Sequence, residues 1–182
     1  MKKLMMCMIA LGLAMFVGCT PTAEQINKTA TAIGSAAGLV ADKTGIKDDA
    51  RNALVTVLNE VRSCVPAEGQ SFEVAWTPVI KAKVEELVAA GKITASTGSI
   101  VTSVALMAAK AVDYMFDVRF PKAKQYEELV RAGVSGALDG FLAVFKPVNC
   151  DECSDCTDCE VRARAKADYD KEAYEWFKKN WK

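Results

Sequence analysis

Apolar residues recur at intervals of three and four along most of the chain, and this period constrains the fold more than any other feature. In the first such stretch the apolar residues are Ile26, Ala30, Ile33, Ala37 and Val40, which share one face of an α-helix. No segment of four or more residues alternates convincingly as a half-buried strand would, and no Asn-Gly type of turn separates β-branched runs. The sequence therefore predicts an all-α protein, a single bundle of about five helices followed by a Cys-rich loop and a C-terminal helix.

The second and third helices are bounded by caps and prolines. Asp48 or Asp49 suits the N-terminus of the second helix, and Pro66 stops it. Its apolar face includes Val61, Val65 and Cys64. A free cysteine on such a face favours an inert, buried role over a reactive one.

The third helix has two candidate starts. Ser71 offers one N-cap, and Thr77 offers another, with Pro78 then as the first helical residue. Gly91 ends this helix in either case.

The fourth and fifth helices are the most apolar in the chain. The run from Ile100 to Val118 is apolar on nearly every face, which is typical of a helix at the centre of a bundle or in a membrane. Lys110 and Asp113 inside the run favour the centre of a bundle. Pro121 ends this helix and starts the next, whose apolar face extends from Tyr126 to Phe145.

Small residues repeat on two of the predicted helices. Gly133, Gly136 and Gly140 each cost about 1 kcal/mol relative to Ala in a helix, so their presence predicts close contact with a neighbour. We expect that neighbour to be the first helix, which carries Gly34 and Gly38. The alternative is a dimerisation face that resembles the membrane G-x-x-x-G pattern.

The N-terminus has the pattern of an export signal. Lys2 and Lys3 precede the apolar run Leu4 to Val17, which is shorter than the roughly 20 residues that a membrane span needs. The run closes on Gly18-Cys19 and resembles the lipobox of bacterial lipoproteins, in which a lipidated cysteine becomes the mature N-terminus. The resemblance covers residues 1–19 only.

This resemblance implies a signal peptide at residues 1–18, an acylated Cys19 and attachment to a membrane of the cell envelope. Thr20 follows the cysteine where the inner-membrane retention signal has Asp, which resembles the outer-membrane default. The predicted domains are then the helical bundle at 19–148, a Cys-rich acidic loop at 149–160 and an amphipathic helix at 161–182. Partners on this interpretation are the membrane, through the lipid, and an envelope protein or a second copy.

Composition narrows the function. The chain has no histidine, which removes the commonest general base and every Ser-His-Asp or Cys-His arrangement. Its 23 basic and 23 acidic residues leave no basic excess for nucleic acid. We therefore expect a structural or partner-binding protein, with no enzymatic activity and no cofactor. A cell-wall hydrolase that uses only carboxylates is the remote alternative, and it would draw on Glu60, Glu85, Glu86 and Asp139.

One segment carries explicit chemistry. Its four cysteines have the spacing C-x-x-C-x-x-C-x-x-C among five carboxylates and are Cys150, Cys153, Cys156 and Cys159. In an oxidising envelope this spacing favours two local disulfides that leave Cys64 free, and a Cys64–Cys150 link is the competing pairing. The alternatives to disulfides are a zinc site, an iron–sulfur cluster, whose ferredoxin spacing this run resembles without matching the last interval, and a redox-active thiol pair.

The chain ends in a second helical pattern. Tyr169, Ala173, Trp176 and Phe177 fall on one side of the C-terminal helix, with lysines near its end. We expect this helix to pack over the bundle, and contact with a membrane interface is the alternative.

Overall fold

The computed structural model describes residues 21–43, 45–67, 70–145 and 168–180. Within these residues the chain forms α-helices and short helical turns and no strand, which confirms the all-α prediction. The elements are α2 (Ala23–Asp42), α3 (Asp48–Val61), α4 (Phe72–Ala89), α5 (Ala95–Tyr114), the π-helical turn η1 (Met115–Arg119), the 3₁₀ turn η2 (Pro121–Gln125), α6 (Glu127–Phe145) and α8 (Lys171–Asn180).

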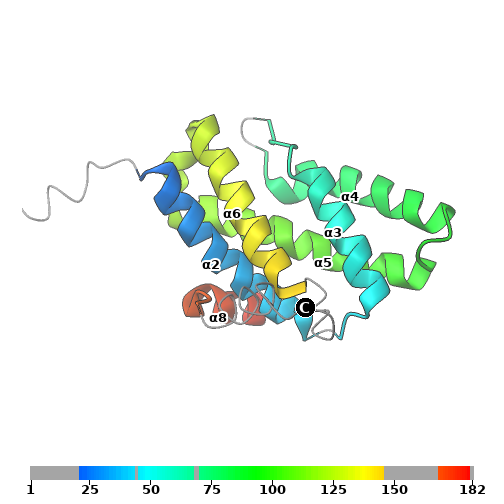
Figure 1. The fold of residues 1–182 in the computed structure, drawn as a ribbon. Coiled ribbons are helices and arrows are strands. Elements are labelled where there is room, and N and C mark those ends of the chain that lie inside the picture. The colour runs from blue at the N-terminus through cyan, green and yellow to red at the C-terminus, as the bar shows by residue number, and fades with distance from the viewer. Residues whose placement is uncertain (1–20, 44, 68–69, 146–167, 181–182) are drawn as a thin grey trace, which may run out of the picture.

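The two glycine-bearing helices, α2 and α6, pack side by side in the same direction (Figure 1). Asn27 Nδ2 donates to the Ala132 carbonyl at 3.1 Å, and Ser35 Oγ donates to the Gly140 carbonyl at 3.2 Å. Both bonds join residues 105 positions apart, so the helices run parallel. A Cβ atom on Gly34 would lie 2.7 Å from the Ala137 carbonyl carbon. The small residues therefore serve packing within the chain, as predicted, and bring the two backbones together.

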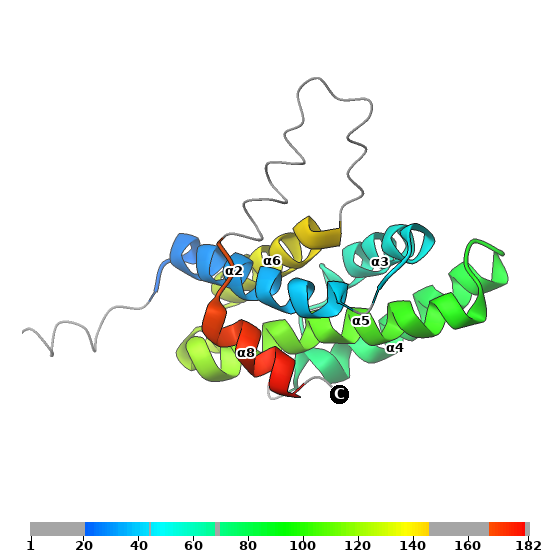
Figure 2. The same ribbon diagram turned by 90° about the horizontal axis from the view of Figure 1, so that it is seen from below.

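The bundle has two layers, seen most clearly in Figure 2. Helices α2, α6 and α3 form one layer, and α4, α5 and α8 form the other. Helix α5 contacts α2, α3, α4 and α6, which is the central position predicted for the fourth helix. The α5–η1 stretch, Ala95–Arg119, is also long and apolar enough to cross a membrane by length and composition, with a mean hydropathy of 1.3. Half of that window is buried against the rest of the bundle, and such burial is expected of a core helix.

The C-terminal helix α8 packs against α2, as expected. Ala173 and Phe177 are buried, and the Asp170 amide donates to the Ala32 carbonyl at 3.2 Å. The Trp176 ring remains 37 % exposed and lies 4.8 Å from the Tyr114 ring, centroid to centroid.

Two expectations about α3 and α4 needed correction or a choice. Helix α3 starts at Asp48 as predicted but ends at Val61, before Pro66, so Val65 leaves the apolar face and is 39 % exposed. Of the two starts for α4, the structure has Ser71 as the N-cap, with its side chain accepting from the Val74 amide at 3.2 Å. Pro78 therefore lies inside the helix.

The connection from α5 to α6 also differs from the prediction. The chain leaves α5 through η1 and makes the 3₁₀ turn η2 at Pro121, and α6 begins only at Glu127. Tyr126 adopts an extended conformation between η2 and α6 and is 46 % exposed, so its assignment to the apolar face was wrong. Val118 is likewise exposed, because it falls in η1 after the regular helix has ended.

Candidate functional site

One end of the bundle carries the first described residues after the predicted lipidation site; it is formed by residues 22–26 and 115–130, and we call it the Thr22 end. Thr22 follows Cys19 by three positions, although Cys19 itself lies outside the described residues. A capping box fixes the start of α2, because the Gln25 amide donates to Thr22 Oγ1 at 3.2 Å and the Thr22 amide donates to Gln25 Oε1 at 3.0 Å. Helix α2 therefore begins with a defined geometry, close behind Cys19 in the chain.

The start of α6 and the turn η1 lie against the start of α2 at this end. A Cβ atom on Gly133 would collide with the side chains of Met115 and Phe116 and would lie 3.2 Å from Cγ2 of Ile26. The turn η2 comes directly before α6, so its exposed residues lie at the same end of the molecule.

Most charges near the Thr22 end are used in ion pairs. Arg119 binds Asp170 at 2.9 Å and Glu172 at 2.8 Å, which ties η1 to the start of α8. Lys124 binds Asp117 at 3.0 Å. Lys122 is exposed and has no ion-pair partner within the part of the chain that the structure describes. Its ammonium group is therefore available to an external partner.

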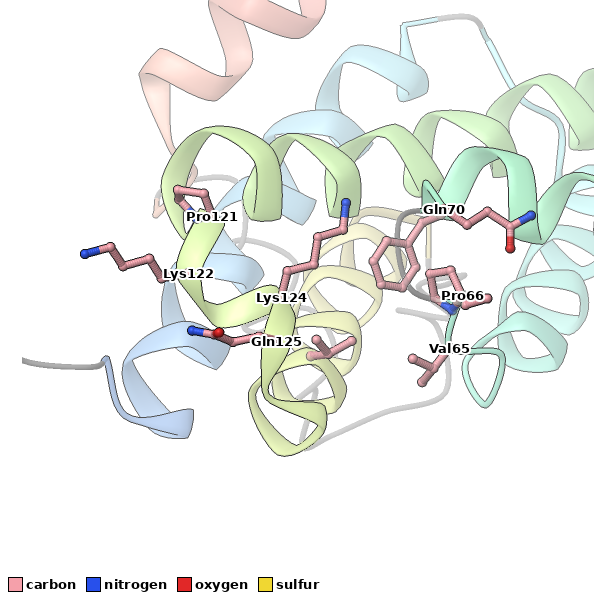
Figure 3. Close-up of a pocket in the computed structure, with 10 residues that line it drawn as sticks. Val65, Pro66, Gln70, Pro121, Lys122, Lys124 and Gln125 are labelled. Atoms are coloured by element: carbon pink, nitrogen blue, oxygen red, sulfur yellow. The ribbon is translucent and has the colours of Figure 1, made fainter.

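A hollow of about 370 Å³ lies between η2 and the α3–α4 connection (Figure 3). Its walls include the apolar side chains of Val65, Pro66, Phe72 and Val130. Its polar groups do not converge, because Lys122 and Gln125 extend to one side and Gln70 extends to the other (Figure 3). A small polar substrate would find no set of aligned partners here.

A second hollow, of about 410 Å³, lies between the start of α4, the end of α5 and α8. Asp113 borders it and accepts hydrogen bonds from the amides of Phe72 at 2.7 Å and Glu73 at 3.0 Å. This carboxylate caps the first turn of α4 from another helix. Burial raises the pKa of Asp113, and the two backbone hydrogen bonds oppose that rise. Glu73 pairs with Lys110 at 3.5 Å, so the polar groups of this hollow take part in the packing of the helices.

Of the four carboxylates of the hydrolase alternative, the structure brings Glu60 and Glu86 to one ammonium group and places Asp139 and Glu85 elsewhere. Glu60 and Glu86 both approach Lys83, at 4.0 and 2.8 Å, and both side chains are more than half exposed. Asp139 binds Arg62 at 2.6 Å, and Glu85 borders a shallow hollow elsewhere on α4. The general acid of a glycosidase occupies a buried, apolar environment, whereas the Glu60 and Glu86 side chains are exposed.

The cysteine predictions fall largely outside the described residues, where Cys19, Cys150, Cys153, Cys156 and Cys159 all lie. Cys64 is a free thiol and is half-buried, with its Sγ 3.9 Å from the Glu60 carbonyl oxygen. Its own carbonyl accepts a hydrogen bond from the buried Trp76 indole at 2.7 Å. Among the residues that the structure describes, no group of three or more Cys, Asp or Glu side chains is placed to hold a metal ion.

Sequence reasoning missed two features of these sites. The role of Asp113 was signalled only by a carboxylate inside an apolar run, and its partners lie 40 and 41 positions away. The exposure of Lys122 depends on the 3₁₀ turn, which no periodicity marked.

Comparison with family models, curated proteins and solved structures found no match to this chain.

Proposed function

We propose that this chain is a lipid-anchored cell-envelope protein with a structural or partner-binding role and without enzymatic activity. The observation that carries the proposal is the N-terminal signal, in which Lys2 and Lys3, an apolar run and Gly18-Cys19 lead into the capped start of α2. The acyl chains of a lipoprotein cysteine exceed the single chain that gives only marginal anchoring, so attachment would be stable. Thr20 after the cysteine favours the outer membrane.

The described residues support a role in binding or structure over one in catalysis. The candidate carboxylates Glu60, Glu86 and Asp139 are engaged by Lys83 and Arg62. The hollow beside η2 has polar groups that point apart (Figure 3). What the bundle offers to a partner is a rigid helical surface held close to the membrane.

Expression of the full chain beside the Cys19→Ala variant in a bacterial host tests this proposal. We expect the wild-type chain to incorporate a labelled fatty acid and to sediment with the envelope membranes. Cys19→Ala removes the thiol that accepts the lipid, so the variant should incorporate no label. The Cys64→Ala variant is the control for acylation at another cysteine, and it should incorporate as much labelled fatty acid as the wild-type chain. A wild-type chain that carries no label and stays in the soluble fraction would contradict the proposal.

The second candidate function is a metal-binding or redox module, which the spacing of Cys150, Cys153, Cys156 and Cys159 favours. Four thiolates among carboxylates would be stabilised by a bound cation such as zinc. Elemental analysis and thiol counting on protein purified from the envelope separate the two candidates. Stoichiometric zinc or iron together with four unoxidised thiols would favour the metal-binding or redox module over the structural or partner-binding role.

A further inference from the structure

We propose that the Thr22 end of the bundle rests on the headgroups of the bilayer that holds the acylated Cys19, with η2 and Tyr126 as the contacting surface. This inference rests on the lipid anchor proposed above, and it adds the orientation of the domain. The partner it assigns to this surface is a phospholipid bilayer.

The chain between Cys19 and Thr22, which we call the tether, is short enough to keep the Thr22 end close to the bilayer. Three Cα–Cα steps join Cys19 to Thr22 and span at most about 11 Å when fully extended. The capping box between Thr22 and Gln25 holds the first turn of α2 in place. The tether could become longer by unwinding of this turn only if both capping hydrogen bonds were broken. The first turn of α2 must then lie within about 11 Å of the lipidated residue.

Helix α2 cannot swing away from the bundle to satisfy the tether. Its backbone contacts α6 so closely that Cβ atoms on Gly34 and Gly140 would collide with carbonyl groups of the other helix. The Asp170 amide also bonds the Ala32 carbonyl and attaches α8 to α2. The whole bundle therefore moves with α2, and the tether keeps its Thr22 end next to the bilayer.

The side chains at this end suit the headgroup region. Lys122 is exposed and extends away from the hollow, and a lysine stem can lie along apolar surface with its ammonium group at phosphate level (Figure 3). Tyr126 combines an exposed ring with a hydroxyl, the type of side chain that is enriched at membrane interfaces.

Electrostatic attraction does not drive this contact. Glu24 and Glu128 lie at the same end as Lys122 and offset its charge, while Glu127 pairs with Arg131 at 2.7 Å. The short tether keeps the surface at a high local concentration next to the bilayer, and that is sufficient for contact. We therefore expect the orientation in purely zwitterionic vesicles, without a requirement for anionic lipid.

This orientation directs the opposite end of the bundle away from the membrane. The helical stretch Ala95–Arg119 has 25 residues and spans about 35 Å from the α4–α5 turn to the Thr22 end. The turn at Gly91 and Lys92 is then the most distant described part of the domain (Figures 1 and 2). A partner in the adjacent compartment would meet that tip first.

Lysine footprinting tests the orientation without new cysteines. The lipidated full chain, reconstituted in phosphatidylcholine vesicles, and its unlipidated Cys19→Ser counterpart in buffer are treated with a water-soluble amine acylating reagent. Peptide masses then give the modification rate at each lysine. We expect the rate at Lys122 to fall several-fold in the vesicles, while the rate at Lys92, an exposed lysine at the far tip, stays unchanged.

A second variant tests the tether itself. A flexible Gly/Ser insert of about ten residues between Thr20 and Pro21 would extend the reach by about 17 Å as a random coil, and the protection of Lys122 should then decrease. Unprotected Lys122 in protein whose Cys19 peptide carries lipid would overturn the orientation and leave the anchor intact. Protection that the insert leaves unchanged would show that the surface binds on its own and would overturn the tether argument. An unlipidated Cys19 peptide would overturn the anchor and the orientation together.

Discussion

The close approach of α2 and α6 makes a specific prediction for Gly34→Ala. In an ordinary exposed helix interior, replacing Gly by Ala stabilises by about 1 kcal/mol. At Gly34 the new methyl group would lie on the Ala137 carbonyl, 2.7 Å from its carbon and 3.0 Å from its Cα. These are backbone atoms, so no side-chain rotation relieves the collision, and the two helices must separate.

The magnitude follows from the cost of overpacking. Inserting one methyl group into a well-packed core typically costs about 1–3 kcal/mol, and a rigid backbone neighbour places this site at the upper end of that range. We therefore expect Gly34→Ala to destabilise the domain by about 2 kcal/mol after the gain in helix propensity is subtracted. For a domain of this size the melting temperature would fall by about 4–8 °C.

Urea unfolding of the unlipidated chain, followed by circular dichroism at the helix band, measures the effect. Gly98→Ala is the matched control, because the three atoms nearest to its methyl group belong to the side chains of Val84, Val88 and Ile93, and Val84 and Val88 border a surface hollow. The loss of unfolding free energy in Gly98→Ala should be clearly smaller than in Gly34→Ala. Gly34→Ala with equal or greater stability than the wild-type chain would refute the close parallel packing of α2 and α6.

Three further predictions concern single side chains. Trp76→Phe removes the indole donor to the Cys64 carbonyl and leaves a void in the core, so it should destabilise by at least about 1 kcal/mol in the same urea assay, and an unchanged midpoint would argue against that bond. Burial raises the pKa of Asp113, so the folded chain holds this proton more tightly than the unfolded chain does. The unfolding free energy should therefore fall as pH rises from the ordinary carboxyl pKa through the raised one, and Asp113→Asn should lack this component; equal pH slopes would contradict it. Because we expect two disulfides within residues 150–159, a lipidated chain under non-reducing, denaturing conditions should have one reactive thiol, Cys64. A cross-linked peptide that contains Cys64 would refute these local disulfides.

Local patterns in the sequence predicted the fold well where packing follows periodicity. The stripe from Ile26 to Val40 is buried as predicted, and α3 begins at Asp48, where a carboxylate suits a helix N-terminus. The glycines of the fifth predicted helix indicated a close neighbour, and α2 is that neighbour. These features depend on residues within a few turns of one another or on steric size alone.

The sequence left choices open where distant contacts decide the local structure. It offered Ser71 or Thr77 as the N-cap of α4, and the structure has Ser71, with the helix beginning at Phe72. Asp113 caps its first two amides from α5, and the Trp76 indole bonds a carbonyl beyond the end of α3. These contacts offset the loss of a helical hydrogen bond at the proline. No pattern within the segment itself could have indicated them.

The proposed surface shows the same division. The signal that ends at Cys19 is a local pattern and was apparent in the sequence. The residues that meet the bilayer in our proposal, Lys122 and Tyr126, are brought beside the start of α2 only by the parallel packing of α2 and α6. That Lys122 and Tyr126 lie together beside the start of α2 could be known only from the folded structure.

The mass of the N-terminal peptide, from protein extracted from envelope membranes, is the decisive measurement for the lipid anchor. We expect a peptide that begins at Cys19 and carries the mass of acyl chains. A mature protein that still begins at Met1, or that is cleaved elsewhere and bears no lipid, would contradict the lipid anchor.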